Sequence, residues 1–162
     1  MPSADFLGTA EPAFDNQFMV YFTALPTLTP FYVNSINLPT MTWGEAKSSY
    51  FITERKFATG ATVDDAKMDV KDFVEVNTAA AVWAWFLSVG NPTAGTLNSP
   101  SAYKSSGMII LTDGRGNPLN TWTLTGAWPK VVAFGSLKQT TGGSGGIIEV
   151  SITIAVDRID LG

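Results

Sequence analysis

The chain has 162 residues, of which 45% are apolar and 15% charged, and its formal net charge is −4. This length fits one domain with a hydrophobic core better than two small domains, and the composition excludes a disordered chain. The basic residues do not cluster beyond Arg55-Lys56, which argues against firm nucleic-acid binding, although an acidic wall along which DNA slides is compatible with the charge. So little surface charge favours self-association.

The chain contains neither cysteine nor histidine. The absence of these two residue types excludes disulfides, thiolate metal sites, cysteine nucleophiles and Ser-His-Asp triads. The carboxylates are scattered, the glycines at 142–146 lack the Gly-Lys-Ser/Thr of a phosphate loop, and Asp113 to Asn117 lacks the bidentate Glu of a calcium loop. We therefore predict no catalytic, cofactor-binding or metal site, and no enzyme.

The amino-terminal region predicts an arm followed by two strands. Residues 1–15 contain helix-breaking and strand-breaking prolines and form an extended arm, and they lack a signal peptide. Its apolar residues either fold back onto this domain or dock on a neighbouring subunit; they are Phe6, Leu7 and Phe14. Residues 16–24 alternate as a first strand, and residues 31–38 predict a second strand that Pro39 ends.

A hairpin or long excursion is expected between residues 40 and 65, with a turn at Ala58-Thr59-Gly60. It carries Trp43, Tyr50 and Phe51, which either contact another subunit or cover the edge of their own core.

Residues 67–76 predict a strand whose polar face is a solvated surface rather than a site; that face carries Lys67, Asp69, Lys71 and Glu75. The chain then predicts one helix, over residues 78–90, capped by Asn77 or Thr78. It is almost wholly apolar, so we expect it to be well buried on the sheet and against a neighbouring subunit.

The carboxyl-terminal half predicts strands separated by turns. A surface loop at 91–106 precedes a short strand at 108–111, a turn at 113–118, and strands at 119–124 and 130–134. The clearest strand spans residues 148–156, with β-branched residues on one face and Glu149, Ser151 and Thr153 on the other. We expect it to pair with residues 119–124. The fold is thus predicted to be mainly β with one helix.

A set of segments follows one another in a characteristic order over nearly the whole chain. They are Phe18-Met19-Val20-Tyr21-Phe22, an excursion ending near Arg55-Lys56-Phe57, Val76-Asn77 leading into Trp83-Ala84-Trp85-Phe86, the turn from Ile110 to Pro118, Trp122, and Ala127-Trp128-Pro129. In this order they resemble the tail tube proteins of bacteriophages with contractile tails. The long arm and the glycine-rich connection near 142–146 depart from the resemblance.

The resemblance implies a β-sandwich or barrel with a flanking helix, built by residues 16–162. It implies a structural virion protein, six copies of which close into a ring, with rings stacked into a hollow tube through which DNA leaves the capsid. The implied partners are other copies, the tail sheath protein, baseplate proteins that initiate the tube, the tail terminator, a tape measure protein in the lumen, and transiently passing DNA. No cofactor and no membrane are implied, and the expected location is the phage tail, assembled in the host bacterial cytoplasm.

For such a tube we expect a lumen wall formed by the polar strand faces, which are Lys67, Asp69, Lys71, Glu75, Glu149, Ser151 and Thr153. Net negative charge would keep a passing polyanion from adhering to that wall. Ring stacking is expected to use the arm at 1–15, the excursion at 40–65 and the loop at 91–106. Two alternatives are the tube protein of a secretion system or phage-like injection particle, and a monomeric β-sandwich binding module.

Overall fold

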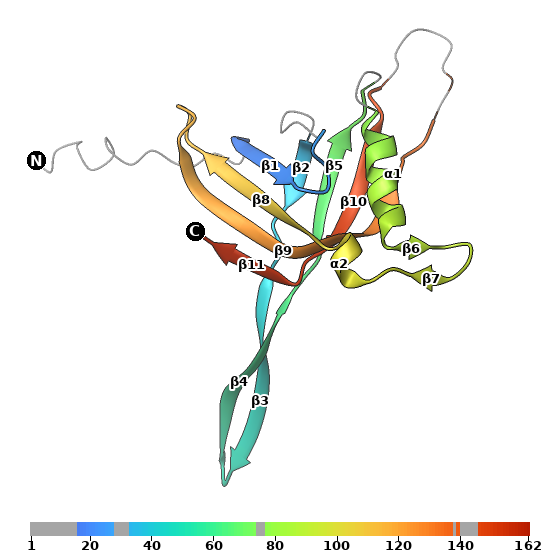
Figure 1. The fold of residues 1–162 in the computed structure, drawn as a ribbon. Helices are drawn as coiled ribbons and strands as arrows, with labels where there is room; N and C mark the ends of the chain where they lie inside the picture. The colour runs from blue at the N-terminus through green and yellow to red at the C-terminus, as the bar shows by residue number, and fades with distance from the viewer. Residues whose placement is uncertain (1–15, 28–32, 74–76, 138, 140–145) are drawn as a thin grey trace, which may run out of the picture.

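The computed structural model describes residues 16–27, 33–73, 77–137, 139 and 146–162 (Figure 1). The predicted arm at 1–15, with Phe6, Leu7 and Phe14, lies outside the described residues, as do Glu75 and most of the glycine-rich connection.

An antiparallel sheet of seven strands organises the described chain. Its strand order is β1-β8-β9-β10-β5-β2, and β11 also pairs with β9. The strands are β1 (Phe18–Phe22), β2 (Val33–Asn37), β5 (Ala66–Lys71), β8 (Ser105–Thr112), β9 (Pro118–Ala133), β10 (Glu149–Ala155) and β11 (Arg158–Leu161). Both strands predicted in residues 16–38 are confirmed.

Strand β9 is shared by the two halves of this sheet. Its first part pairs with β8 and β11, and its second part pairs with β10. The prediction of two separate strands at 119–124 and 130–134 was wrong, because Gly126 adopts φ +68° and lets one strand of 16 residues bend without ending. The predicted partner of the last strand was also wrong. Strand β10 pairs with Trp128–Ala133 and with β5, whereas 119–124 pairs with β8 and β11.

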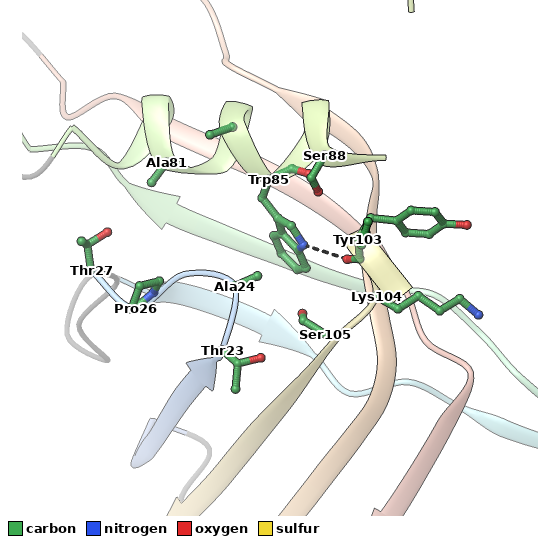
Figure 2. A pocket seen from close by; sticks show the side chains of 12 residues that line it. Thr23, Ala24, Pro26, Thr27, Ala81, Trp85, Ser88, Tyr103, Lys104 and Ser105 are labelled. Atoms are coloured by element: carbon green, nitrogen blue, oxygen red, sulfur yellow. Dashed lines mark hydrogen bonds between the residues drawn. The ribbon is translucent and has the colours of Figure 1, made fainter. Parts of the chain in front are cut away.

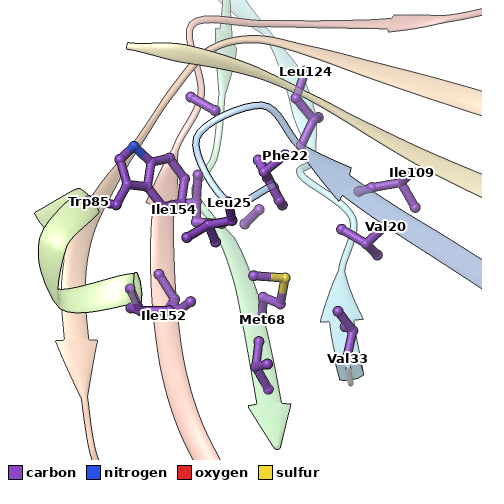
Figure 3. Packing of buried hydrophobic residues seen from close by; sticks show 14 of the residues in the cluster. Val20, Phe22, Leu25, Val33, Met68, Trp85, Ile109, Leu124, Ile152 and Ile154 are labelled. Atoms are coloured by element: carbon purple, nitrogen blue, oxygen red, sulfur yellow. The ribbon is translucent and has the colours of Figure 1, made fainter. Parts of the chain in front are cut away.

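The core lies between the two halves of the sheet and one helix (Figure 3). Alternate residues of β10 and β5 are fully buried, which confirms the period-two pattern in both strands. They meet residues from the other half of the sheet, so the sheet folds over on itself. The cluster includes Val20, Phe22, Ile109 and Leu124 from one half and Met68, Val70, Val150, Ile152 and Ile154 from the other.

Helix α1 (Thr78–Ser88) covers one side of this core. Asn77 caps it, and its side-chain oxygen accepts a hydrogen bond of 3.2 Å from the N–H of Ala80. Val82 and Trp85 are buried, but Trp83 is 42% and Leu87 is 39% exposed. The prediction of a well-buried helix therefore holds for one face only, because the described part of the chain does not cover the opposite face.

The predicted hairpin between residues 40 and 65 is confirmed as β3 (Met41–Tyr50) and β4 (Thr53–Val63). Its turn lies between Tyr50 and Thr53, so the prediction of a turn at Ala58-Thr59-Gly60 was wrong. Those residues lie within β4, where the register shifts between the pairs Trp43–Ala61 and Glu45–Ala58. A bulge accommodates extra residues without reversing the chain.

The region predicted as a loop at 91–106 contains short elements. They are β6 (Gly90–Asn91), β7 (Thr96–Leu97) and α2 (Pro100–Tyr103). The short strand expected at 108–111 is longer, because β8 begins at Ser105, and strand β11 was not predicted. No helix in the described ranges has the length and apolar character needed to cross a membrane.

Candidate assembly surfaces

The outer surface of β5 and β10 is polar and densely hydrogen-bonded. Cross-strand register pairs Glu149 with Lys71, Ser151 with Asp69, and Thr153 with Lys67. Directly opposite residues in an antiparallel pair share a face. Six of the seven residues expected in a lumen wall therefore share one face, here called the polar sheet face, and the seventh, Glu75, lies outside the described residues.

Neutral donors hold the two carboxylates of the polar sheet face in place. The hydroxyl of Ser151 donates to Asp69 Oδ1 at 2.6 Å, and the hydroxyl of Ser35 donates to Asp69 Oδ2 at 3.0 Å. Asn34 donates from Nδ2 to Glu149 Oε1 at 3.1 Å. These bonds tie β2, β5 and β10 together across their outer surface and fix the positions of the charges.

The charges of the polar sheet face cancel. Lys67 and Lys71 carry two positive charges, and Asp69 and Glu149 carry two negative ones. The chain's net charge of −4 therefore does not arise from these four residues. We expected a negatively charged wall that repels a polyanion, but the six described residues of the polar sheet face have no net charge and do not support this expectation.

The hairpin of β3 and β4 extends away from the rest of the molecule (Figure 1). Every residue of β3 except Gly44, and every residue of β4 except Val63, is exposed. At its tip, Phe51 is 90% and Ile52 is 100% exposed, and the ring of Phe51 lies edge-on to Tyr50 with centroids 4.9 Å apart. An apolar tip of this kind is typical of a surface that another molecule covers.

A second apolar surface, which the described residues leave uncovered, is the outer face of α1. No residue of this helix is charged. Trp83 stacks on Phe86 at 5.3 Å between ring centroids and lies edge-on to Phe134 at 5.8 Å. The outer face of a surface helix in a monomeric protein normally carries charged residues, so this face also favours a partner.

An open groove of about 610 Å³ lies between α1, α2 and the end of β1 (Figure 2). Trp85 lies in it and donates from Nε1 to the carbonyl oxygen of Tyr103 at 3.4 Å. Lys104 Nζ is 2.5 Å from Asp157 Oδ2. Because this lysine is already paired, and small or apolar side chains form most of the lining, the groove offers no acid–base pair for catalysis.

The described residues contain no group of three or more acidic side chains that could hold a metal ion. In the turn at 113–118, the Asp113 carboxylate accepts hydrogen bonds from the N–H of Arg115 at 2.9 Å and from the N–H of Asn117 at 2.8 Å. The bonds from Asn117 are the main cause that lowers the pKa of Asp113 below its ordinary value. This carboxylate shapes a turn, as the sequence predicted.

Some exposed residues of these surfaces were not singled out from the sequence. Ile52 and Phe57 are exposed on the hairpin, and Phe134 beside α1 is 40% exposed. A signal for Ile52 was available, since it directly follows Tyr50 and Phe51. No local signal separates Phe57 and Phe134 from core residues, because their exposure depends on which strands pair.

No protein-family model and no curated protein matches the chain. Solved structures do. A chain from the sheath–tube complex of an extracellular contractile injection system in the extended state is 17% identical with a TM-score of 0.73, and the match covers 100% of this chain and 99% of that one. A chain from the tube-terminating cap of the anti-feeding prophage is 19% identical with a TM-score of 0.74, covering 94% and 92%. A type six secretion system protein is 8% identical with a TM-score of 0.52, covering 89% and 81%.

These similarities concern the fold. The chain has a mainly β, tail-tube-like fold with a flanking helix, and the predicted fold class is confirmed.

Proposed function

We propose that this chain is a structural subunit that polymerises into the hollow inner tube of a contractile particle. Residues 16–162 form the tube domain, and residues 1–15 form an arm that contacts neighbouring copies. Six copies close into a ring, and rings stack into a conduit. Its partners are other copies of the chain, a sheath, and the baseplate and terminator proteins at the two ends of the tube.

The observation that carries this proposal is a fold match that extends over the whole of this chain and nearly the whole of a chain from a sheath–tube complex. The uncovered surfaces add support. The hairpin tip and the outer face of α1 are both apolar, lie in different parts of the fold, and are not copies of each other. Two unlike surfaces on one subunit generate head-to-tail assembly, which gives rings when it closes and filaments when it does not.

Within the tube, the polar sheet face lines the lumen. The outer face of α1 lies on the other side of the core, where a neighbouring copy covers it. Trp43, Tyr50 and Phe51 of the hairpin then contact another subunit.

One candidate cargo of the conduit is a phage genome, ejected through a tail. The other is protein, conveyed by an injection particle, and the similarity to chains of an extracellular contractile injection system and of the anti-feeding prophage favours this second cargo. The cancelled charge of the polar sheet face suits it too, because such a wall does not discriminate between cargo of opposite charges.

Electron microscopy of the purified full-length protein at high concentration tests the proposal. We expect stacked rings or hollow tubes in negative stain. A protein that stays monomeric, both alone and with preformed tube ends, would favour a solitary binding module instead.

Cysteine labelling tests which face lines the lumen, because the chain has no native cysteine. Glu149→Cys places a thiol on the polar sheet face, where it is exposed in the single chain. Before assembly, this thiol should react both with a small maleimide and with a maleimide on a polymer too large to enter a tube. In assembled tubes it should react with the small reagent only. Undiminished reaction with the large reagent in tubes would contradict the lumen assignment.

A further inference from the structure

The hairpin of β3 and β4 has two chemically unlike faces. Register places Ala46 opposite Phe57 and Tyr50 opposite Thr53, and residues in such pairs lie on the same face. Ser48 and Arg55 lie between these two pairs. This side, here called the Phe57 face, carries the exposed rings of Tyr50 and Phe57 and a single charge, that of Arg55.

The opposite side carries a ladder of ion pairs. Lys47 Nζ lies 3.3 Å from Glu54 Oε1, and Lys56 Nζ lies 3.7 Å from Glu45 Oε1. All four side chains are about half exposed, so the pairs add little to stability. Their charges would be costly to bury, however, because each must give up its hydration. This ion-pair face is therefore suited to stay in water.

The hairpin does not fold back onto its own domain. Asn37 of β2 pairs with Lys67 of β5, and Met41 of β3 pairs with Val63 of β4, in one unbroken antiparallel register. Between these two pairs, the N–H of Asp64 donates to the carbonyl oxygen of Thr40 at 2.9 Å. The ladder of β2 and β5 thus continues into the hairpin as one ribbon, which holds the hairpin away from its own core. Beyond the sheet, the outer hairpin is a two-stranded ribbon without a covering layer, which is marginally stable in water. A cover supplied by another molecule would therefore stabilise it.

We propose that the Phe57 face packs against a second copy of this chain while the ion-pair face stays in water. A second copy supplies a matching surface, because the outer face of α1 is also apolar, exposed and without charge. The proposal rests on the proposed function and adds to it the side of the hairpin that makes the contact. Phe57, rather than the tip alone, then becomes a determinant of assembly.

Two neighbouring substitutions that add the same charge test this orientation. Phe57→Lys places a cation on the Phe57 face, whereas Ala58→Lys places one on the ion-pair face, directly opposite Glu45. Both positions are exposed and lie outside the core, so both variants should fold; far-ultraviolet circular dichroism and urea unfolding of the unassembled proteins check this. Sedimentation and negative-stain microscopy then give the protein concentration needed for assembly.

We expect Phe57→Lys to raise that concentration about tenfold or more, and Ala58→Lys to change it less than about twofold. Equal assembly of both variants would overturn the proposal and leave the Phe57 face to a different protein; a block by Ala58→Lys alone would overturn it too. The unsubstituted protein separates this proposal from the proposed function. If the unsubstituted and the Phe57→Lys proteins form tubes equally well, the proposed tube function stands and the proposed contact of the Phe57 face is refuted. If the unsubstituted protein forms only small non-tubular complexes, and Phe57→Lys dissociates them, the contact stands and the tube function is refuted. A protein that never self-associates refutes both.

Discussion

Replacing Gly126 by alanine tests whether the shared strand β9 depends on a left-handed residue at its bend. Gly126 has φ +68°, a conformation that favours glycine. A Cβ atom at this position would also collide with the carboxylate of Asp157, which is paired with Lys104.

The expected loss of stability has two parts. Holding alanine in the left-handed region costs about 1–2 kcal/mol. Displacing Asp157 disturbs its pair with Lys104, whose side chains are 53% and 31% exposed, and a pair so accessible to water contributes at most about 1 kcal/mol. The free energy of unfolding should therefore fall by about 1–3 kcal/mol.

Urea unfolding, followed by circular dichroism at a concentration where the chain is unassembled, measures this loss. Gly60→Ala is the control, because a Cβ at Gly60 meets no atom within 4 Å and the residue has no left-handed φ. Adding Asp157→Ala to the Gly126→Ala protein should restore little stability, because the Cβ atom of residue 157 stays 2.9 Å from the new Cβ, the backbone strain remains and the pair with Lys104 is lost. If Gly126→Ala stays within about 0.5 kcal/mol of the unsubstituted protein, the bend does not require glycine and the reasoning fails.

Three further predictions follow from other parts of the fold. Ile152→Ala should lower the free energy of unfolding by about 2–5 kcal/mol because Ile152 is 1% exposed, whereas its neighbour Ser151→Ala, which loses only an exposed hydrogen bond, should cost about 1 kcal/mol or less in the same urea assay. The lowered pKa of Asp113 means that its contribution to stability is present above the ordinary aspartate pKa and is lost as the pH falls through the lowered value, so Asp113→Asn should flatten the acid limb of a stability–pH curve; an unchanged limb would refute this role. Deleting residues 2–12 should weaken tube formation in negative stain, and undiminished polymerisation would remove the arm from the mechanism.

The period-two alternation in β10 and β5 and the apolar stripe of α1 were readable from the sequence. Each depends only on which side of a single strand or helix a residue occupies, and that is set by the local geometry of the backbone. The polar turn at Asp113 was predictable for the same reason, because its hydrogen bonds join residues within four positions of each other.

The pairing of the strands could not be predicted from such local patterns. The sequence analysis named residues 119–124 as the partner of β10, whereas β10 pairs with residues 128–133, and only the folded sheet decides which segments lie side by side. The continuity of β9 depends on a single glycine whose left-handed φ the sequence does not reveal.

The sequence by itself determined which residues prefer strands, a helix or turns, and which faces are polar or apolar. The tertiary structure decided which apolar faces its own core covers. Val82 and Trp83 are adjacent in an almost uniformly apolar helix, yet one is buried and the other exposed. Phe22 is buried and Phe57 exposed, although both lie on strands. Burial depends on contacts between residues far apart in the chain, and these exist only once the sheet has folded over on itself.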